Sequence, residues 1–340
     1  MLGRFGSRSS ARRGRWITPA ERATPILAVA GPTAVGKSAA ALELAALLER
    51  DGIRAVLISA DSRQVFRGFD IGTDKLPADL LATRPHSGID VAEADQPFTL
   101  YDWLAIARAA ATGTPLGERP QIAIVVGGTG LYHRGLLRGF LKGGARPHDP
   151  EVRARLEREL AEEGRGHMES QLRGLNPAAA DAVATASSRR IVRALEIAQL
   201  GGDPLATEEE PWPAPHAYVL LEETDHAAHR AKIAERAAAQ FRDGLLEETK
   251  DLVARLPAET PALSGIGYRE AIQVLANQIN VEKAITHSSG RCWAYARRQR
   301  TWFRGEPISH MISAGASQPT AAVAAALHTI ARELIEQAGG

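Results

Sequence analysis

The feature that most constrains this chain is a glycine-bounded loop between an apolar run and a helical pattern. Residues 26–30 are all apolar and predict a buried parallel strand, and residues 39–50 continue with helical spacing. Between them, the two glycines, the lysine and the serine of Gly31–Ser38 fit G-x-x-x-x-G-K-[ST], the phosphate-binding loop. With a strand before it and a helix after it, the pattern predicts a polyphosphate site rather than a chance glycine-rich turn.

Each residue type in this loop has a chemical reason. The glycines let backbone N–H groups turn inward around phosphate oxygens, and the following helix directs the positive end of its dipole there. Lys37 adds a positive charge, and the Ser38 hydroxyl can bind Mg²⁺, so Ser38 is the predicted metal ligand. The predicted diphosphate-binding residues are Gly31, Thr33, Ala34, Val35, Gly36, Lys37 and Ser38. The loop alone does not choose among kinases, hydrolases and transferases.

Two other apolar runs end in polar residues. Residues 55–60 lead into Asp61–Gln64, and residues 121–126 lead into a glycine pair and Thr129. Because the carboxyl ends of parallel strands meet at one edge of a sheet, these loops should converge with the phosphate loop. The sequence therefore predicts an α/β fold with a P-loop-type parallel sheet flanked by helices, and residues 217–221 as its fourth strand.

Composition is that of an ordinary soluble protein of about two domains by length. The chain has 340 residues, of which 44% are hydrophobic and 24% are charged. No apolar run approaches the roughly 20 residues of a membrane span, so no membrane association is expected. The net charge of +1 means that nucleic-acid binding would depend on local patches. The single cysteine, Cys292, excludes disulfides and a cysteine zinc site within this chain and favours a reducing, cytoplasmic location.

Changes in composition and in apolar pattern divide the chain into four parts. Residues 1–24 carry six arginines and one glutamate without an apolar stretch, which predicts a disordered basic tail. An organelle transit peptide and an RNA-touching arm remain the alternatives for this tail. Residues 25–148 and 203–310 form the predicted core domain, and residues 149–202 form a small helical insertion without strand-like runs. Residues 311–340 are predicted to hold a C-terminal helix.

A long helix predicted at residues 285–304 is basic at its end. Its last eight positions hold four arginines together with Trp302 and Phe303. This pattern fits a solvated basic helix with an aromatic core face. It fits equally a surface for phosphates and splayed RNA bases.

Together these motifs resemble the tRNA dimethylallyltransferase family, also called tRNA isopentenyltransferases. The match runs from about Ile26 to Arg304. Each block is short, but their order and spacing make the set specific. The blocks lie at residues 31–38, 59–68, 70–75, 127–132, 149–153, 190–196, 266–270 and 298–304.

The resemblance implies a reaction, two catalytic residues and a set of RNA contacts. Enzymes of this family move a dimethylallyl group from its diphosphate to N6 of the adenosine 3′ of the anticodon, and their helical insertion grips the anticodon stem-loop. It implies Asp61 as the general base, Thr129 as a ligand near the leaving diphosphate, and Mg²⁺ as the cofactor. We expect a monomer with dimethylallyl diphosphate and tRNA as partners. The implied tRNA contacts are Asp61, Ser62, Arg63, Gln64, Arg153, Arg190, Arg193, Arg298 and Gln299.

Physical chemistry supports these roles without the family. An adenine amine is a weak nucleophile, so a carboxylate that takes its proton as the N–C bond forms would help. Asp61 can do this, although a Mg²⁺ ligand and a strand-end cap are its alternatives, and Thr129 can equally be a plain turn residue. Lys37, backbone N–H groups and Mg²⁺ on Ser38 can stabilise the leaving diphosphate. The adenine must leave its stack to reach such a pocket.

The sequence departs from the family pattern at three places. His86-Ser87-Gly88 stands where two histidines and a leucine are usual, and residues 185–188 lack an expected Asn-Asp pair. Cys292-Trp293 stands where Thr-Arg is expected. These departures bear on secondary contacts and tRNA affinity more than on the chemistry.

Three other functions compete with this interpretation. A relative that prenylates free adenine nucleotides would not need the helical insertion or the basic helix. A small-molecule kinase or nucleotide hydrolase would need a set of lid arginines that the sequence does not supply in an obvious form. A non-catalytic RNA-binding protein would have no use for Lys37, Ser38 and Asp61 together.

Overall fold

The structure is a computed structural model that describes residues 23–112, 119–139, 147–206, 211–315 and 318–339. The chain divides into two compact units, Met1–Gln96 with Ile106–Gly130 and Pro213–Gly340, and Pro97–Ala105 with Leu131–Trp212. Residues 1–22 of the predicted basic tail lie outside the described residues. Thr24 is buried, and its hydroxyl donates to the Ala111 carbonyl at 2.8 Å.

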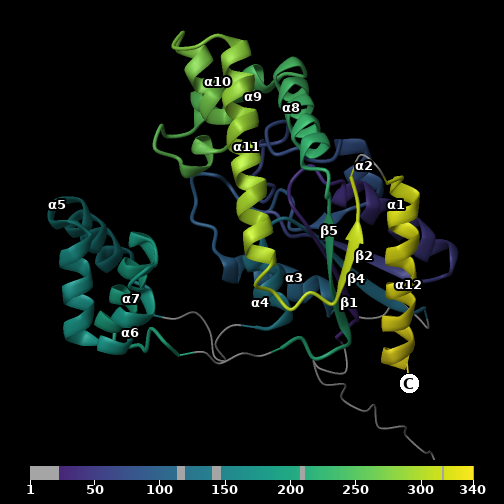
Figure 1. Ribbon diagram of the computed structural model, residues 1–340, viewed down its shortest axis with the longest axis horizontal. Helices are drawn as coiled ribbons and strands as arrows, with labels where there is room; N and C mark the ends of the chain where they lie inside the picture. Colours follow the sequence, from purple (N-terminus) through teal and green to yellow (C-terminus); the bar gives the residue numbers. More distant parts are fainter. Residues whose placement is uncertain (1–22, 113–118, 140–146, 207–210, 316–317, 340) are drawn as a thin grey trace, which may run out of the picture. The chain divides into compact units, whose positions relative to one another are not determined.

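The first unit is built on a six-stranded sheet. Its strands are β1 (Ile26–Ala30), β2 (Arg54–Ser59), β3 (His86–Ser87), β4 (Gln121–Gly127), β5 (His216–Glu222) and β6 (His310–Ser313). The strand order is β3-β2-β4-β1-β5-β6, and each of these pairings is parallel. Figure 1 labels β1, β2, β4 and β5 of this sheet. Because the strands run the same way, the loops after β1, β2 and β4 leave from the same edge.

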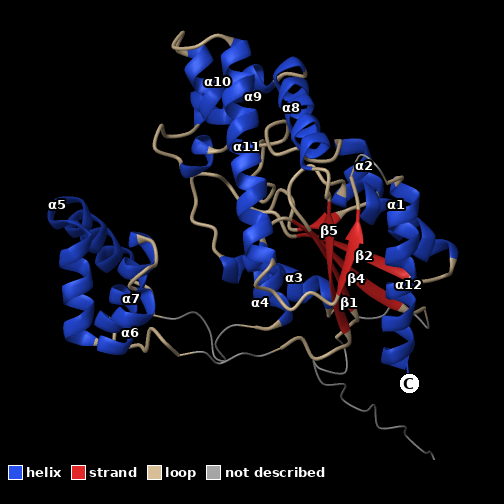
Figure 2. Ribbon diagram, in the orientation of Figure 1, coloured by secondary structure: helices blue, strands red, loops and turns tan. Residues whose placement is uncertain are grey.

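Helices cover the sheet and extend the first unit. They are α1 (Lys37–Arg50), α2 (Ala78–Thr83), α8 (His226–Arg242), α9 (Leu245–Arg255), η2 (Pro261–Ser264), α10 (Tyr268–Leu275), α11 (Val281–Phe303) and α12 (Thr320–Gly339). In chain order, α3 (Leu100–Ala111) precedes β4 and α4 (Gly130–Leu137) follows it. Helices α1 and α12 pack beside the sheet (Figure 2), where Leu44 and Leu327 share one apolar cluster with Val29 of β1. Removing these side chains from water is the main force that holds the layers together.

A second apolar cluster joins α8 to α11. Phe241, Leu245 and Tyr268 pack there with Phe69, which comes from the loop after β2. Helix α11 begins at Val281 rather than at the predicted residue 285. The reason is a cap, because the Asn280 side chain accepts a hydrogen bond from the Lys283 N–H at 2.9 Å.

The second unit is helical in its described residues, with α5 (Pro150–Leu175), α6 (Pro177–Val183) and α7 (Ser188–Gln199). Asp149 caps α5 by accepting from the Glu151 N–H at 2.8 Å, and Pro150 follows at the first helical position. Gly164, with φ 77° and ψ 178°, breaks α5 in its middle. The helices bury a core of their own that includes Leu156, Met168, Leu172, Ile191 and Leu195.

The predicted fold class is confirmed, with a parallel P-loop-type sheet, flanking helices and a helical insertion. Two edge strands were not predicted. β3 has only two residues, and three of the four residues of β6 are exposed, so neither carries an apolar run. Each forms because a neighbouring strand supplies backbone partners. Within the described residues, no helix has both the length and the apolar character that crossing a membrane requires.

Candidate active site

The phosphate loop joins β1 to α1 and is anchored in the core by the buried Val35 side chain. Gly31 lies where the loop passes β5, and a Cβ there would be 2.5 Å from the Leu221 carbonyl oxygen. Gly36 has a φ of 99°, in the region that favours glycine, and α1 begins at the next residue. The two glycines therefore let the loop bend closely around the start of α1.

Lys37 bends back over this loop. Its Nζ donates to the Pro32 carbonyl at 2.7 Å. Burial lowers the Lys37 pKa to about 8, although the nearby Asp61 carboxylate acts to raise it. An anion bound beside the ammonium group would favour its charged form. Ser38 follows on the first turn of α1, and its side chain is exposed.

Gln299 of α11 connects the phosphate loop to the loop after β4. Its Oε1 accepts from the Thr33 N–H at 2.8 Å, and its Nε2 donates to the Gly128 carbonyl at 2.9 Å. The side chain is 6% exposed. Both ends of the amide are thus used within the protein, and the predicted contact of Gln299 with tRNA stays a prediction.

Thr129 connects the loop after β4 to the loop after β2. Its hydroxyl accepts from the Ser62 N–H at 3.0 Å, and its own N–H donates to the Ala60 carbonyl at 3.0 Å. A Cβ on Gly127 would lie 2.2 Å from that same carbonyl oxygen, so the two backbones meet closely. With Gln299, these bonds bring together all three loops that the sequence placed at one edge of the sheet.

Asp61 opens a tight turn at the end of β2. Its Oδ1 accepts from the N–H groups of Arg63 at 2.8 Å and Gln64 at 3.4 Å, so the strand-end cap exists. Its Oδ2 has no hydrogen-bond partner among the described residues. Burial, then the Asp61 charge, raises the pKa of Tyr295 on α11 to about 12. The exposed guanidinium of Arg298 lies 5.7 Å from the centre of that ring, so basic and aromatic groups of α11 stand beside Asp61.

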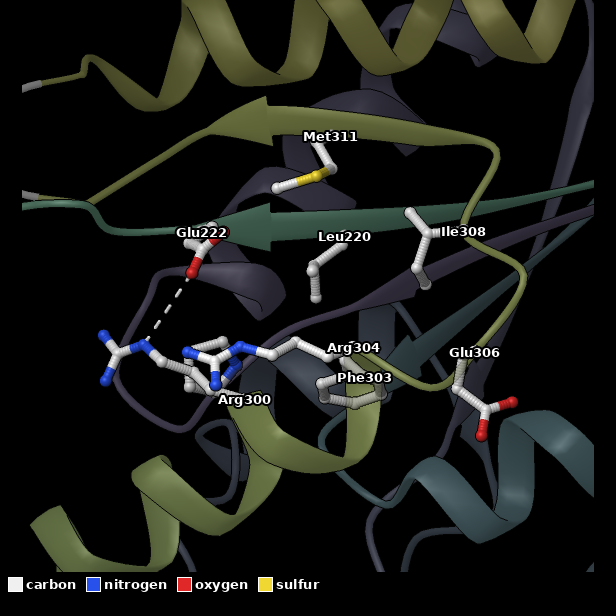
Figure 3. Close-up of a pocket in the computed structure, with 9 residues that line it drawn as sticks. Leu220, Glu222, Arg300, Phe303, Arg304, Glu306, Ile308 and Met311 are labelled. Carbon is white, nitrogen blue, oxygen red and sulfur yellow. Dashed lines mark ion pairs between the residues drawn. The ribbon is translucent and has the colours of Figure 1, made fainter.

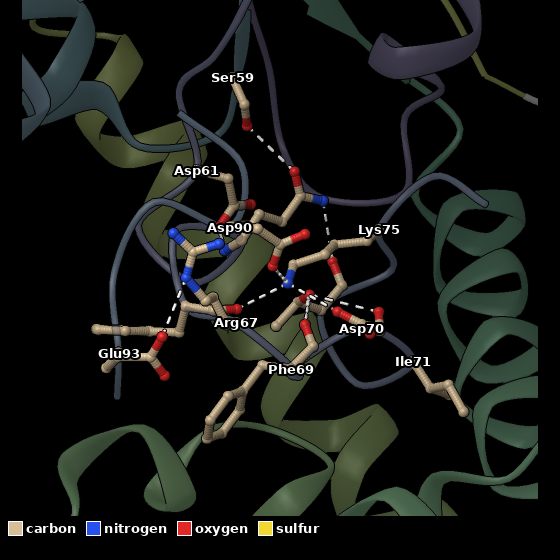
Figure 4. Close-up of polar contacts among 12 residues, drawn as sticks. Ser59, Asp61, Arg67, Phe69, Asp70, Ile71, Lys75, Asp90 and Glu93 are labelled. Atoms are coloured by element: carbon tan, nitrogen blue, oxygen red, sulfur yellow. Dashed lines mark hydrogen bonds and ion pairs between the residues drawn. The ribbon is translucent and has the colours of Figure 1, made fainter. Parts of the chain in front are cut away.

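The segment after Asp61 is held by a group of polar contacts (Figure 4). The Gln64 amide accepts from the Ser59 hydroxyl at 3.1 Å and donates to the Thr73 carbonyl at 3.1 Å. The Lys75 side chain is buried, and its Nζ reaches the Phe66 carbonyl, Asp70 and Asp90. These bonds fix the backbone on which Asp61 stands. Gln64 is therefore occupied within the protein, and Arg63 is exposed.

Arg236 of α8 is a site residue that sequence reasoning missed. Its Nη2 donates to the Thr33 hydroxyl at 2.6 Å, and its Nη1 pairs with Asp74 at 3.1 Å. It places a second, half-buried cation next to the phosphate loop, where its charge lowers the Lys37 pKa. Arg236 belongs to an ordinary helical pattern without a motif, so no sequence signal marks it.

Three predicted tRNA-binding arginines lie in the second unit. Arg153 and Arg193 both donate to the fully buried Glu196, at 3.1 Å and 2.6 Å, and His148 contacts its other oxygen. Burial opposes ionisation, but the hydrogen bonds from Arg193 and His148 lower the Glu196 pKa. The cluster ties the start of α5 to α7. Arg190 is exposed on the first turn of α7.

Comparison with known proteins identifies the family. The sequence matches the family described as IPP transferase over residues 64–306. The chain belongs to this family. Curated IPP transferase relatives include the tRNA dimethylallyltransferases of Roseiflexus castenholzii, 36% identical over 83% of this chain and 90% of the relative, and of Clavibacter sepedonicus, 37% identical over 82% and 90%. The predicted resemblance and the predicted transferase class are thereby confirmed.

Solved structures agree with this assignment. A full-length tRNA isopentenylpyrophosphate transferase from Bacillus halodurans is similar with a TM-score of 0.64 and 28% identity, over 93% of this chain and 98% of that one. A eukaryotic dimethylallyltransferase that acts on tRNA shares the fold with a TM-score of 0.69 at 22% identity, over 86% and 74%. The IPP transferase fold therefore extends over nearly the whole chain.

Proposed function

We propose that this chain transfers the dimethylallyl group from dimethylallyl diphosphate to N6 of the adenosine 3′ of the anticodon in tRNA, releasing diphosphate. The observation that carries the proposal is the joining of three loops, in which Gln299 and Thr129 bind the phosphate loop, the β4 loop and the Asp61 turn together. The curated relatives, named tRNA dimethylallyltransferases, support the same reaction. The predicted monomeric state and cytoplasmic location are part of this proposal.

Asp61 supplies the base in this mechanism. The bond from N6 to the allylic carbon forms as the bond from that carbon to the diphosphate oxygen breaks, and the electron pair leaves with diphosphate. The N6 proton passes to Oδ2 of Asp61, because Oδ1 already accepts from the turn. The adenine must be extruded from the anticodon-loop stack to approach this oxygen.

The phosphate loop and its neighbours hold the leaving group. Lys37 and the loop N–H groups supply positive charge where the diphosphate gains negative charge. Arg236, bonded to Thr33, adds a fixed cation from α8. Thr129, whose hydroxyl accepts from the Ser62 N–H next to Asp61, is the proposed ligand near the leaving diphosphate.

The oxygen ligands available beside the phosphate loop suit Mg²⁺, which we propose as the cofactor. Among the described residues, no group of three or more His, Cys, Asp or Glu side chains is placed to hold a metal ion. Mg²⁺ is commonly held by few protein oxygens together with substrate phosphate oxygens, and the exposed Ser38 hydroxyl at the start of α1 suits that arrangement. When bound, the ion would neutralise part of the diphosphate charge.

Each unit carries proposed tRNA contacts, on the helices of the second unit and on exposed arginines of the first. Arg190→Ala should weaken tRNA binding and lower the slope of log K against log salt by about 1, because one phosphate contact is lost. Arg158→Ala is the matched control, since Arg158 is also exposed on this unit but is not among the predicted contacts. Filter binding at several salt concentrations measures both. An equal slope for the two variants would remove Arg190 from the phosphate contacts.

The pH dependence of catalysis should report Lys37. With a pKa of about 8, its amine is charged below that pH and largely neutral above it. Of the neighbouring groups, Arg236 lowers this pKa, and Asp61, Asp74 and Cys292 raise it. Because kcat/KM follows the ionisation of the free enzyme, kcat/KM for dimethylallyl diphosphate should fall as pH rises through about 8. Lys37→Arg should retain activity at higher pH, since arginine stays protonated. A fall at the same pH in that variant would assign the ionisation to another group.

A transfer assay tests the function itself. Purified protein, Mg²⁺ and labelled dimethylallyl diphosphate are offered unmodified tRNA, AMP and ATP in separate reactions. Label in tRNA alone is expected. Label in the nucleotides alone would make the chain a cytokinin-forming prenyltransferase, and hydrolysis of ATP without prenyl transfer would place it among kinases and hydrolases.

A further inference from the structure

The backbone N–H, the carbonyl and the hydroxyl of Thr33 in the phosphate loop form hydrogen bonds with side chains of helices α8 and α11. The Thr33 N–H donates to Gln299 Oε1, and the Thr33 hydroxyl accepts from the Arg236 guanidinium. The Thr33 carbonyl is bonded by His229 of α8, whose Nε2 lies 2.8 Å from the oxygen. His229 is 1% exposed, and none of the sequence motifs includes it.

Arg300 of α11 decides which nitrogen of His229 carries the proton. Its Nη2 lies 2.6 Å from His229 Nδ1. A guanidinium can only donate, so Nδ1 must accept, and the ring proton must be on Nε2. That proton is then donated to the Thr33 carbonyl. Arg300, His229 and Thr33 thus form one directed chain of hydrogen bonds, which we call the Arg300–His229–Thr33 relay.

The relay is enclosed. The Trp293 ring lies edge-on to His229 at 5.8 Å and beneath the Arg300 guanidinium at 5.3 Å. Arg300 is 6% exposed, lines a hollow of about 330 Å³ beside β5, and has its Nε 4.0 Å from Glu222 Oε1 (Figure 3). The His229 ring therefore holds one end of the guanidinium by a hydrogen bond, and the Glu222 carboxylate lies within ion-pair distance of its Nε.

The surroundings also keep His229 neutral. Burial lowers its pKa, and the charges of Arg300 and Lys37 act in the same direction. The Thr33 carbonyl and Glu223 oppose the shift. A protonated ring would direct an Nδ1–H at the Arg300 guanidinium, so protonation and the relay exclude each other.

We propose that His229, held in its Nε2–H tautomer by Arg300, is a positioning residue that fixes the Thr33 carbonyl on the α8 side of the phosphate loop and so keeps the loop ready for diphosphate. This inference rests on the proposed diphosphate site. An anion is bound best by donors that are already oriented, and an unheld carbonyl oxygen beside them would repel it.

Two substitutions of His229 separate this role from packing. His229→Gln places an amide N–H near the position of Nε2 and keeps donation to Thr33. His229→Asn places its amide near Nδ1, keeps acceptance from Arg300 and loses donation to Thr33. Inorganic pyrophosphate with Mg²⁺ is titrated into the full chain by calorimetry, and thermal unfolding is recorded for each variant.

The two variants should differ in their affinity for pyrophosphate. His229→Gln should bind pyrophosphate within about threefold of the original chain, and His229→Asn should bind about tenfold more weakly. In steady state, KM for dimethylallyl diphosphate should follow the same order, with little change in KM for tRNA. Equal losses in both variants, or no loss in either, would overturn the positioning role.

A second measurement does not depend on the ligand. The ¹⁵N NMR signals of His229, assigned by their loss in His229→Gln, should show a protonated Nε2 and an unprotonated Nδ1. A protonated Nδ1 would overturn the relay whatever the binding results. Failure of the original chain to bind pyrophosphate, with the expected tautomer present, would instead overturn the diphosphate site and with it the purpose of the relay.

Discussion

Asp61→Asn is expected to lower kcat by about 10²- to 10⁴-fold while tRNA affinity changes by less than about twofold, because only proton transfer is lost. The Asn side chain oxygen can still accept from the Arg63 N–H, so the turn after β2 keeps its cap. The amide cannot take the N6 proton. Single-turnover kinetics with saturating tRNA and dimethylallyl diphosphate isolates this step from product release.

Asp61→Ala is the matched control for the cap. It removes the base and also the acceptor for Arg63 and Gln64, so it should lose stability in addition to activity. Turnover close to that of the original chain in Asp61→Asn, with a loss only in Asp61→Ala, would mean that Asp61 is a strand-end cap and that another group takes the proton.

The sequence predicts those strands well whose burial requires a run of apolar side chains. β1 and β4 are fully buried, so their apolar runs mark them. β3 and β6 have no apolar run, because they form through backbone pairing with β2 and β5. Helix α5 resumes its helical path after the break at Gly164 and continues to Leu175.

The candidate site divides in the same way. Lys37 sits in a motif whose spacing has a chemical reason, and Asp61 and Thr129 follow apolar runs at predicted strand ends. The roles of Asp61 and Thr129 are those that the family resemblance implies, and they stay predictions. Arg236 and His229 join the site by hydrogen bonds to Thr33, which lies 203 and 196 positions away. Their residue types on helix α8 are ordinary, and only the packing of α8 on the phosphate loop gives them a role.

The departures from the family pattern gain meaning in the structure. Cys292 and Trp293 stand where Thr-Arg is expected, and both face the site from α11. The Cys292 sulfur accepts from Arg236 at 3.4 Å, and the Trp293 ring packs against both His229 and Arg300. Position 293 therefore carries an indole ring in place of the expected cation, and this ring packs beneath the Arg300 guanidinium. The altered pair therefore belongs to the scaffold of the phosphate loop.

Lys37→Met is expected to lower kcat/KM for dimethylallyl diphosphate by about 10³-fold, because the site loses a charge aimed at the leaving group. KM for tRNA should stay close to that of the original chain. Lys250→Met is the matched control, since it makes the same change at an exposed position of α9 and should leave the kinetics unchanged. Steady-state kinetics with each substrate varied in turn measures both variants.

Stability should move in the opposite direction to activity in this variant. Burial lowers the Lys37 pKa from its ordinary 10.5 to about 8, so the folded state disfavours the charged amine. Between these pH values the unfolded chain binds more protons than the folded chain, and this group makes stability rise with pH there. Lys37→Met removes the penalty at neutral pH, so its melting temperature should equal or exceed that of the original chain. A melting temperature that falls together with activity would show that Lys37 holds the loop together rather than serving the diphosphate.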